Sequence, residues 1–255
     1  MVVIVPSIDA RISQIAPEFK ALSISVKGTE VQSQEYAKRV LQEACTSVIE
    51  NDYPWAESHI NAWGDVFRQF GAKPNRTPCS AAALRKRVLK DGGMQSIDPI
   101  VDIYNAISIR YAIPVGGEDM DSYQGTPTLT IADGSESFDT MKNGEASIEN
   151  PDVGEVIWRD EVGVTCRRWN WRQGVRTRIE SDTRNMWFIL ESLPEMPLEH
   201  LQEAGQEMIK HLQVIMPDSV IEQSLVFASK SIEVWCDKYF VNGCRCFWKF
   251  DCRNR

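Results

Sequence analysis

The chain has 255 residues, 43% of them hydrophobic, which is enough to bury a substantial core in one large domain or two small ones. Its net charge of -8 argues against indiscriminate nucleic-acid binding, because phosphate groups normally require a basic surface. No apolar run approaches the roughly 20 residues that span a bilayer, the start lacks a signal-peptide pattern, and the cysteines number seven, so we expect a soluble, cytoplasmic protein that does not enter a membrane.

The first part of the chain is predicted to be mostly helical. Residues 1–5 are apolar and partly β-branched, which indicates a short strand before Pro6. Ser80 is the expected N-cap of a helix with a basic last turn that ends at Gly92 and Gly93. A loop is expected at residues 74–78. The helices expected here cover residues 8–15, 31–50, 59–70 and 81–89.

From residue 97 onward the pattern indicates more strands than helices. Residues 99–110 keep the apolar spacing of a helix, which residues 114–117 (Pro-Val-Gly-Gly) end with a turn. An amphipathic helix is expected at residues 198–212. The expected strands are 128–131, 155–158, 163–168, 186–191 and a stretch around 224–234. Because no repeat or low-complexity linker divides the chain, we predict a single α+β domain with a mixed or antiparallel β core flanked by helices.

Residues 166–172, which read Cys-Arg-Arg-Trp-Asn-Trp-Arg and are called the Arg-Trp segment below, have the most distinctive composition. Arginine presents rigid donors to phosphate and tryptophan offers a flat face for stacking, so the segment suits a nucleic-acid or aromatic ligand. The alternative is a strand whose tryptophans fill a core while its arginines reach solvent. Strand alternation would place Arg168, Asn170 and Arg172 toward a ligand and Trp169 and Trp171 opposite, or the reverse.

Two stretches are basic although the whole chain is acidic. Residues 68–90 contain seven Lys and Arg and no acid, and residues 158–178 contain six Arg and two acids. If both stretches lie on one face, the protein carries a basic patch. The alternative is that acids elsewhere neutralise them, as in most charge runs.

Several runs, in order along the chain, resemble the B3/B4 editing domain of the phenylalanyl-tRNA synthetase beta chain and, more closely, its free-standing bacterial relatives. The matching runs are residues 97–105, 113–121, 154–157, the Arg-Trp segment and 183–185, within an agreement from about Leu84 to Glu191. The resemblance implies a B3/B4-like tRNA-editing domain over residues 1–230, followed by a divergent cysteine-containing tail at 231–255. It further implies trans-editing, in which the ester of a wrong amino acid on the terminal adenosine of tRNA is hydrolysed without a tethered synthetase.

The chain departs from the family at two positions. Gly116 stands where the family carries a functional histidine, and residues 168–171 replace the small-residue loop that lines the family's editing pocket. The same scaffold is therefore expected to present a different pocket.

An aminoacyl ester is already activated, so its hydrolysis needs a positioned water and a stabilised oxyanion rather than a strong nucleophile. The expected catalytic residues are Asn105, which could orient the ribose or amino group, and Asp119, which could anchor the ammonium group or a water. Their alternatives are a helix-ending hydrogen bond for Asn105 and a local backbone cap for Asp119. The residues expected to bind substrate or tRNA are Pro114, Gly116, Gly117, Arg167, Arg168, Trp169, Asn170, Trp171 and Arg172.

Other chemistry is not expected. The three histidines, His59, His200 and His211, lie outside the matching runs, so we predict structural roles for them. Cys166 is expected to be an inert apolar residue. Four tail cysteines at 236, 244, 246 and 252 lack paired Cys-x-x-Cys spacing, so we predict no metal and no cofactor.

Three functions remain open from the sequence. The first is a deacylase that acts on mischarged tRNA, the second is a tRNA-binding module without catalysis, and the third is a small-molecule-binding protein on the same scaffold. The oligomeric state is not predicted.

Overall fold

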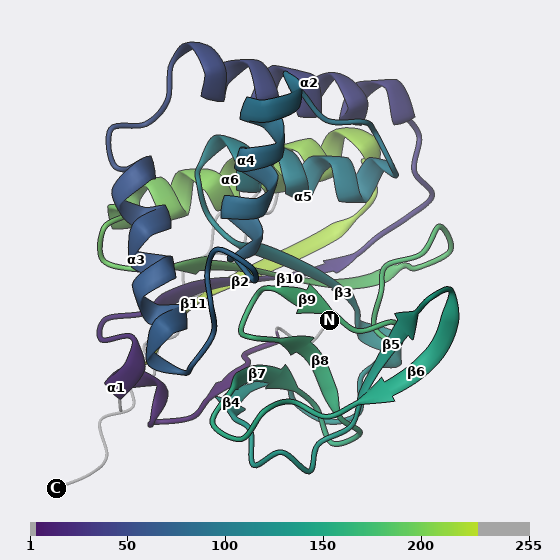
Figure 1. The fold of residues 1–255 in the computed structure, drawn as a ribbon. Helices are drawn as coiled ribbons and strands as arrows, with labels where there is room; N and C mark the ends of the chain where they lie inside the picture. Colours follow the sequence, from purple (N-terminus) through teal and green to yellow (C-terminus); the bar gives the residue numbers. More distant parts are fainter. Residues whose placement is uncertain (1–3, 229–255) are drawn as a thin grey trace, which may run out of the picture.

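Two β-sheets organise the part of the chain described by the computed structural model, residues 4–228 (Figure 1). Sheet A has seven strands in the order β1-β4-β7-β8-β5-β6, with β9 paired to β8, and sheet B has the order β11-β2-β10-β3. The strands of sheet A are β1 (Ser7–Ile8), β4 (Thr128–Ile131), β5 (Phe138–Lys142), β6 (Glu145–Glu149), β7 (Val156–Arg159), β8 (Val164–Arg167) and β9 (Arg172–Gln173). Those of sheet B are β2 (Lys20–Lys27), β3 (Val115–Asp119), β10 (Asn185–Ser192) and β11 (Val220–Phe227).

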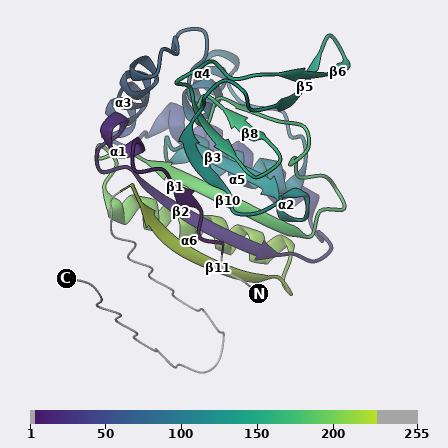
Figure 2. The ribbon, with the colours of Figure 1, turned by 90° about the horizontal axis from the view of Figure 1, so that it is seen from below.

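Helices cover one face of sheet B and sheet A covers the other (Figure 1). Figure 2 shows β11, β2 and β10 running together, with the β5–β6 hairpin projecting from the far side of the molecule. The helices are α1 (Ile12–Ile15), α2 (Gln34–Glu50), α3 (Ala56–Gln69), α4 (Ser80–Asp91), α5 (Pro99–Arg110) and α6 (Leu198–Ile215), and a 3-10 turn η1 spans Met120–Ser122. Within the residues described, no helix is long and apolar enough to cross a membrane.

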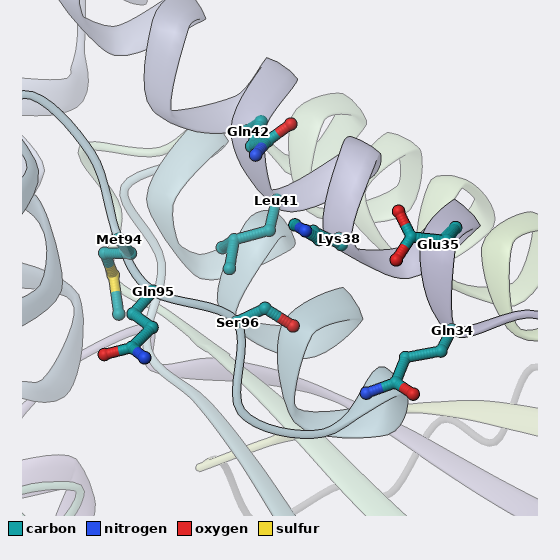
Figure 3. Close-up of a pocket in the computed structure, with 8 residues that line it drawn as sticks. All are labelled: Gln34, Glu35, Lys38, Leu41, Gln42, Met94, Gln95 and Ser96. Atoms are coloured by element: carbon teal, nitrogen blue, oxygen red, sulfur yellow. The ribbon is translucent and has the colours of Figure 1, made fainter.

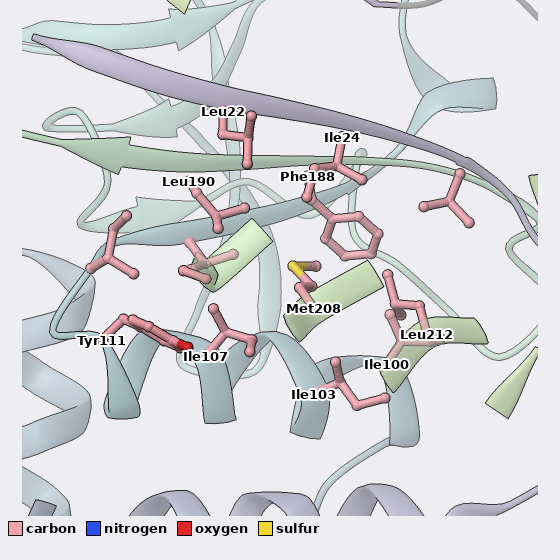
Figure 4. Packing of buried hydrophobic residues seen from close by; sticks show 14 of the residues in the cluster. Leu22, Ile24, Ile100, Ile103, Ile107, Tyr111, Phe188, Leu190, Met208 and Leu212 are labelled. Carbon is pink, nitrogen blue, oxygen red and sulfur yellow. The ribbon is translucent and has the colours of Figure 1, made fainter. Parts of the chain in front are cut away.

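Strand β10 connects the two layers because both of its faces are buried. Phe188 and Leu190 belong to the core that sheet B shares with α5 and α6 (Figure 4). Trp187 and Ile189 alternate with them and belong to the core between sheet B and sheet A. The two cores therefore meet back to back across one strand.

Helix α5 is buried on nearly every side. Asp98 caps it by accepting hydrogen bonds from the backbone amides of Ile100 and Val101, and Pro99 occupies its first turn. One side packs against sheet B, and the side with Ala106 and Ile109 packs against α2 and α4. A second helical layer therefore lies outside the first.

The predicted fold class is confirmed, and several elements match closely. The helix at 99–110 and the strand at 128–131 have the predicted bounds, and the loop at 74–78 is also found. The remaining long helices and the strands at 156–159, 164–167 and 185–192 differ from the predicted ranges by a few residues at their ends.

Other predictions were wrong. The helix cap before α4 is Cys79, whose sulfur accepts from the amide of Ala82, rather than Ser80. Residues 4 and 5 form no strand, and of the stretch 8–15 only Ile12–Ile15 is helical. Residues 115–119 form strand β3 where a turn was expected. Strands β2, β5 and β6 were not predicted. Residues 1–3, the end of the stretch 224–234 and the cysteine-containing tail lie outside the described residues.

Candidate functional site

Strand β3 and the chain that follows the Arg-Trp segment lie side by side. The side-chain amide of Gln173 donates to the carbonyl of Gly117 at 2.9 Å, and the backbone amide of Asp119 donates to the carbonyl of Thr177 at 2.9 Å. The chain directly after the Arg-Trp segment is thus hydrogen-bonded to the strand that contains Gly116 and Gly117.

The Arg-Trp segment is a tight turn rather than a continuous strand. Strand β8 ends at Arg167, and Arg168 and Trp169 adopt left-handed backbone angles, with φ of 46° and 65°. The amide of Trp171 closes the turn by donating to the carbonyl of Arg167 at 3.2 Å. The predicted alternation of the five side chains is therefore wrong, because it assumed extended backbone.

The turn sends its residues in different directions. Trp169 is fully buried and packs edge-on against Phe19 and Trp63. Asn170 is 8% exposed, whereas Trp171 is partly exposed. The guanidinium of Arg168 lies over the ring of Trp171 at 4.8 Å. Of the residues in the turn, 168–172, only the Arg168–Trp171 pair and Arg172 therefore offer surface to a ligand.

Acids neutralise most of the basic stretch at 158–178. Arg167 is buried and makes two hydrogen bonds to Glu155, at 3.0 and 2.8 Å. Ion pairs also join Arg159 to Glu136, Arg168 to Asp152, Arg172 to Glu149 and Arg176 to Asp160. The alternative interpretation of this stretch, neutralisation by acids elsewhere, is the one observed.

The two glycines of β3 face opposite sides of sheet B. A Cβ atom on Gly117 would lie 2.8 Å from the ring of Phe188 and 3.1 Å from that of Tyr104, so core packing occupies the space beside this residue. Gly116 is partly exposed on the face toward sheet A. Pro114 is buried, and its carbonyl accepts from the amide of Glu191 at 3.0 Å.

The two predicted catalytic residues lie apart from the face of sheet B that is directed toward sheet A. Asn105 is 9% exposed and is two residues from both Ile103 and Ile107, which pack against sheet B, so it lies on the opposite side of α5. Asp119 accepts hydrogen bonds from the amide of Asp121 at 2.9 Å and from the hydroxyl of Ser122 at 3.2 Å, which is the local cap named as its alternative. Catalytic roles for both stay predictions.

Glu118, between the glycines and Asp119, was not predicted. It lies opposite Trp187 in the β3–β10 pair and is 5% exposed on the face toward sheet A. Tyr123 donates its hydroxyl to Glu118, Thr177 donates at 3.2 Å, and Tyr123 also lies 3.1 Å from the hydroxyl of Thr165. Burial raises the pKa of Glu118 to about 8, although hydrogen bonds from its neighbours act in the other direction.

A second buried carboxyl group, Glu191, lies on the same face of β10. It is 1% exposed and accepts hydrogen bonds of 2.9 Å from the indoles of Trp158 and Trp169 and from the amide of Asn170. Burial raises the pKa of Glu191 to about 7, and these three donors lower it less. Within residues 4–228 it has no ion-pair partner, and the amide oxygen of Asn170 has no hydrogen-bond partner.

Glu118 and Glu191, with Gly116 on the same face of sheet B, form the candidate site together with the partly exposed Cys166, which lies on β8 of sheet A and packs against the core between the sheets. Burial raises the pKa of the Cys166 thiol, and the charges of Glu118 and Glu191 add to the rise. Carboxyl groups that change protonation near neutral pH can act as general acids or bases. An isolated Glu within the apolar strand at 186–191 was the available sequence signal for Glu191.

The histidines lie elsewhere. His59 is buried, with one ring nitrogen 2.8 Å from the carbonyl of Ala112 and the other accepting from the amide of Leu193, and burial lowers its pKa to about 4. His200 and His211 lie on α6, beside Glu203 and Glu207. These contacts agree with the predicted structural roles.

Two surface cavities are present away from the candidate site. A cavity of about 410 Å³ lies between α2 and residues 94–96, where Lys38, Leu41 and Ser96 line it (Figure 3). A smaller one of about 200 Å³ is lined by residues that include Ser25, Met120 and Met186. Neither is lined by the Arg-Trp segment or by Gly116.

Comparison with known proteins gives three similarities. Residues 62–203 match the model of the B3/4 domain family. Over 100 residues the chain is 29% identical to the phenylalanine--tRNA ligase beta subunit of Tropheryma whipplei (strain Twist). The aligned region covers 39% of this chain and 10% of that protein. The crystal structure of an N-terminal fragment of the phenylalanyl-tRNA synthetase beta-subunit from Pyrococcus horikoshii superposes with a TM-score of 0.41 at 13% identity, over 84% of this chain and 49% of that one. The chain thus spans a tenth of the ligase subunit and about half of the fragment.

Proposed function

Because the chain belongs to the B3/4 domain family, we propose that it binds the acceptor end of mischarged tRNA and hydrolyses the aminoacyl ester in trans. The tRNA part of the proposal is supported by the similarity to a phenylalanine--tRNA ligase beta subunit. The hydrolytic part depends on one observation, the buried carboxyl group of Glu118 beside Gly116 with a pKa near neutrality.

In the proposed reaction, Glu118 acts as the general base. Its carboxylate takes a proton from a water molecule, whose oxygen attacks the ester carbonyl carbon. The bond between that carbon and the ribose oxygen then breaks, and the ribose oxygen takes the proton back from Glu118. The products are the free amino acid and uncharged tRNA, so atoms and charge balance. Arg172 and Trp171, at the surface of the turn, would contact the phosphate and base of the terminal nucleotide.

The proposal predicts a rate that rises with pH. Only the ionised form of Glu118 can accept a proton, and its pKa is about 8, so the ionised fraction increases across the neutral range. The single-turnover deacylation rate should therefore increase up to about pH 8 and then level off. A rate that is flat from about pH 6 to 8 would contradict Glu118 as the base.

The experiment mixes purified protein with a panel of mischarged tRNAs and measures release of labelled amino acid. We expect release from at least one member, and we expect Glu118→Gln to lower the rate by about 100-fold or more while tRNA affinity is retained. Asn105→Ala is the matched comparison, because Asn105 lies on the other side of α5 from sheet B. Loss of turnover in Asn105→Ala with full activity in Glu118→Gln would place the chemistry on the helical side instead.

A tRNA-binding module without catalysis is the second candidate. It is favoured by the deep burial of both carboxyl groups, which are 5% and 1% exposed. Salt-dependent binding of tRNA with unchanged charging across the whole panel would select this function over hydrolysis.

A further inference from the structure

Helix α4 and the turn before it carry cations that acids do not neutralise. Within the described part of the chain, five exposed basic side chains there form no ion pair, whereas five of the six arginines of residues 158–178 do. These five residues, called the α4 basic surface, are Lys73, Arg76, Lys86, Arg87 and Lys90.

The other two basic residues of this stretch have structural partners. Arg85 is 7% exposed, pairs with Asp52 and donates to the carbonyl of Ile109 at 2.7 Å. Arg68 pairs with Asp65 on its own helix. The stretch therefore separates into two arginines with ion-pair partners, of which Arg85 joins α4 to its neighbours, and cations that face solvent without a partner.

Helical geometry gathers three of the free cations on one side. Lys90 follows Lys86 by four residues and Arg87 by three, so the three side chains are neighbours on the outer face of α4. Lys73 and Arg76 occupy the preceding turn, which is fixed because the amides of Arg76 and Thr77 both donate to the carbonyl of Lys73 at 2.8 Å. The nearest acid in sequence is Asp91, at the end of the helix.

Helix α4 begins next to the candidate site. Cys79, its N-cap, lies in the same core cluster as Trp158 and Trp169, the two indoles that donate to Glu191. The charge of Glu191 also contributes to the raised pKa of the Cys79 thiol, after burial as the main cause. From this point the helix runs away from sheet B toward α2 (Figure 1). A polyanion lying along α4 would therefore have one end near Glu191, on the same face of sheet B as Glu118.

We propose that the α4 basic surface binds the sugar-phosphate backbone of the tRNA acceptor stem while the charged end enters the candidate site. That the bound RNA is tRNA rests on the proposed function. That the contact is made by α4 rests only on the unpaired cations of the α4 basic surface. A protein with a net charge of -8 repels a polyanion at long range, and salt screens charges beyond about 10 Å at 0.1 M. Local cations must therefore supply the attraction, and the α4 basic surface gathers five unpaired cations within residues 73–90.

The test compares two double variants with the same change of charge. Lys86→Glu/Lys90→Glu alters the α4 basic surface, and Lys27→Glu/Lys210→Glu alters exposed lysines on β2 and α6 that also form no ion pair within the residues described. Affinity for an uncharged tRNA transcript is measured by filter binding between about 50 and 200 mM salt. Hydrolysis is measured on full-length mischarged tRNA and on an aminoacylated CCA trinucleotide.

We expect Lys86→Glu/Lys90→Glu to weaken tRNA binding by about tenfold or more and to flatten the log-log salt dependence by about two units. The control should change affinity by less than about threefold. Neither variant should alter hydrolysis of the trinucleotide, which lacks the acceptor stem that the α4 basic surface is proposed to bind. Lys73→Gln/Arg76→Gln, outside the helix, provides a second variant with the same expected direction if the first does not fold.

Equal losses in the test and control variants would overturn the inference, because they would reflect total charge alone. Unchanged tRNA affinity in both α4 variants would also overturn it. So would α4 variants that lose binding to anionic vesicles but keep the wild-type affinity for tRNA. Wild-type protein that binds tRNA through α4 but hydrolyses neither substrate would support this inference while removing the proposed catalysis.

Discussion

Glu191 accepts hydrogen bonds from three neutral donors, and within the described residues no cation pairs with it. Its ionised form is therefore unfavourable in the buried interior. Burial raises its pKa in the folded protein to about 7, above the ordinary value of 4.5, so the folded protein keeps a proton that the unfolded chain has already lost. The stabilising effect of that proton is complete below about pH 4.5 and is lost as the pH rises through about 7. The proton on Glu118 also stabilises the folded protein, and this effect is lost as the pH rises through about 8.

Glu191→Gln should therefore flatten the pH dependence of stability. The amide keeps an oxygen for the two indoles, and a rotated Asn170 amide can present its unpartnered oxygen to the new donor. The wild-type free energy of unfolding should fall between about pH 5 and 8, and the variant should remove a part of this fall on the order of 3 kcal/mol. Urea denaturation at both pH values measures this difference. An identical fall in both proteins would refute an ionising Glu191.

The Arg-Trp segment stands out in the sequence, but the predicted directions of its side chains were wrong. The two consecutive left-handed residues, Arg168 and Trp169, have no glycine or asparagine to signal them, so extended backbone was the natural expectation. Glu118 was passed over because its burial depends on Tyr123, Thr165 and Thr177, which come from three different segments. Such long-range contacts leave no local pattern.

At the scale of elements, the glycines of β3 are required by packing rather than by a turn. Gly117→Ala would place a methyl group 2.8 Å from the ring of Phe188 and 3.1 Å from that of Tyr104, both of which are held between sheet B and α5. We expect a loss of about 1–3 kcal/mol in stability. Gly93→Ala is the matched control, because no atom lies within 4 Å of its added carbon, and it should change stability by less than about 0.5 kcal/mol. Similar midpoints for both variants in urea would contradict this packing constraint.

The elements that sequence predicted well are those with local signals. Asp98 and Pro99 mark the start of α5, and an apolar spacing continues to its end. Strand β2 was not predicted although Leu22, Ile24 and Val26 alternate with Ser23 and Ser25, which is the spacing of a strand with one apolar face. The β5–β6 hairpin was missed although Asn143-Gly144, with φ of 53° and 85°, is a strong signal for a two-residue turn.

At the scale of the whole molecule, one aromatic core joins the two sheets and α3. Trp63, Trp158, Trp169 and Trp187 are all at most 3% exposed and contact one another edge-on in pairs. Because this core is continuous with the helical core through β10, we expect the layers to unfold together. Tryptophan fluorescence, to which the four tryptophans of the inter-sheet core contribute, and far-ultraviolet circular dichroism, which reports mainly the helices, should give the same midpoint in urea. Two separated transitions would show that sheet A is an independent unit.

The order of strands in sheet B has a consequence during synthesis. β2 leaves the ribosome early, yet its two partners, β10 and β11, are formed by residues 185–192 and 220–227. Until those residues emerge, both edges of an almost entirely buried strand lack partners, and such edges pair readily with other chains. Expression of fragments that stop before β11 should thus yield aggregates, and slower translation should prolong the need for chaperones.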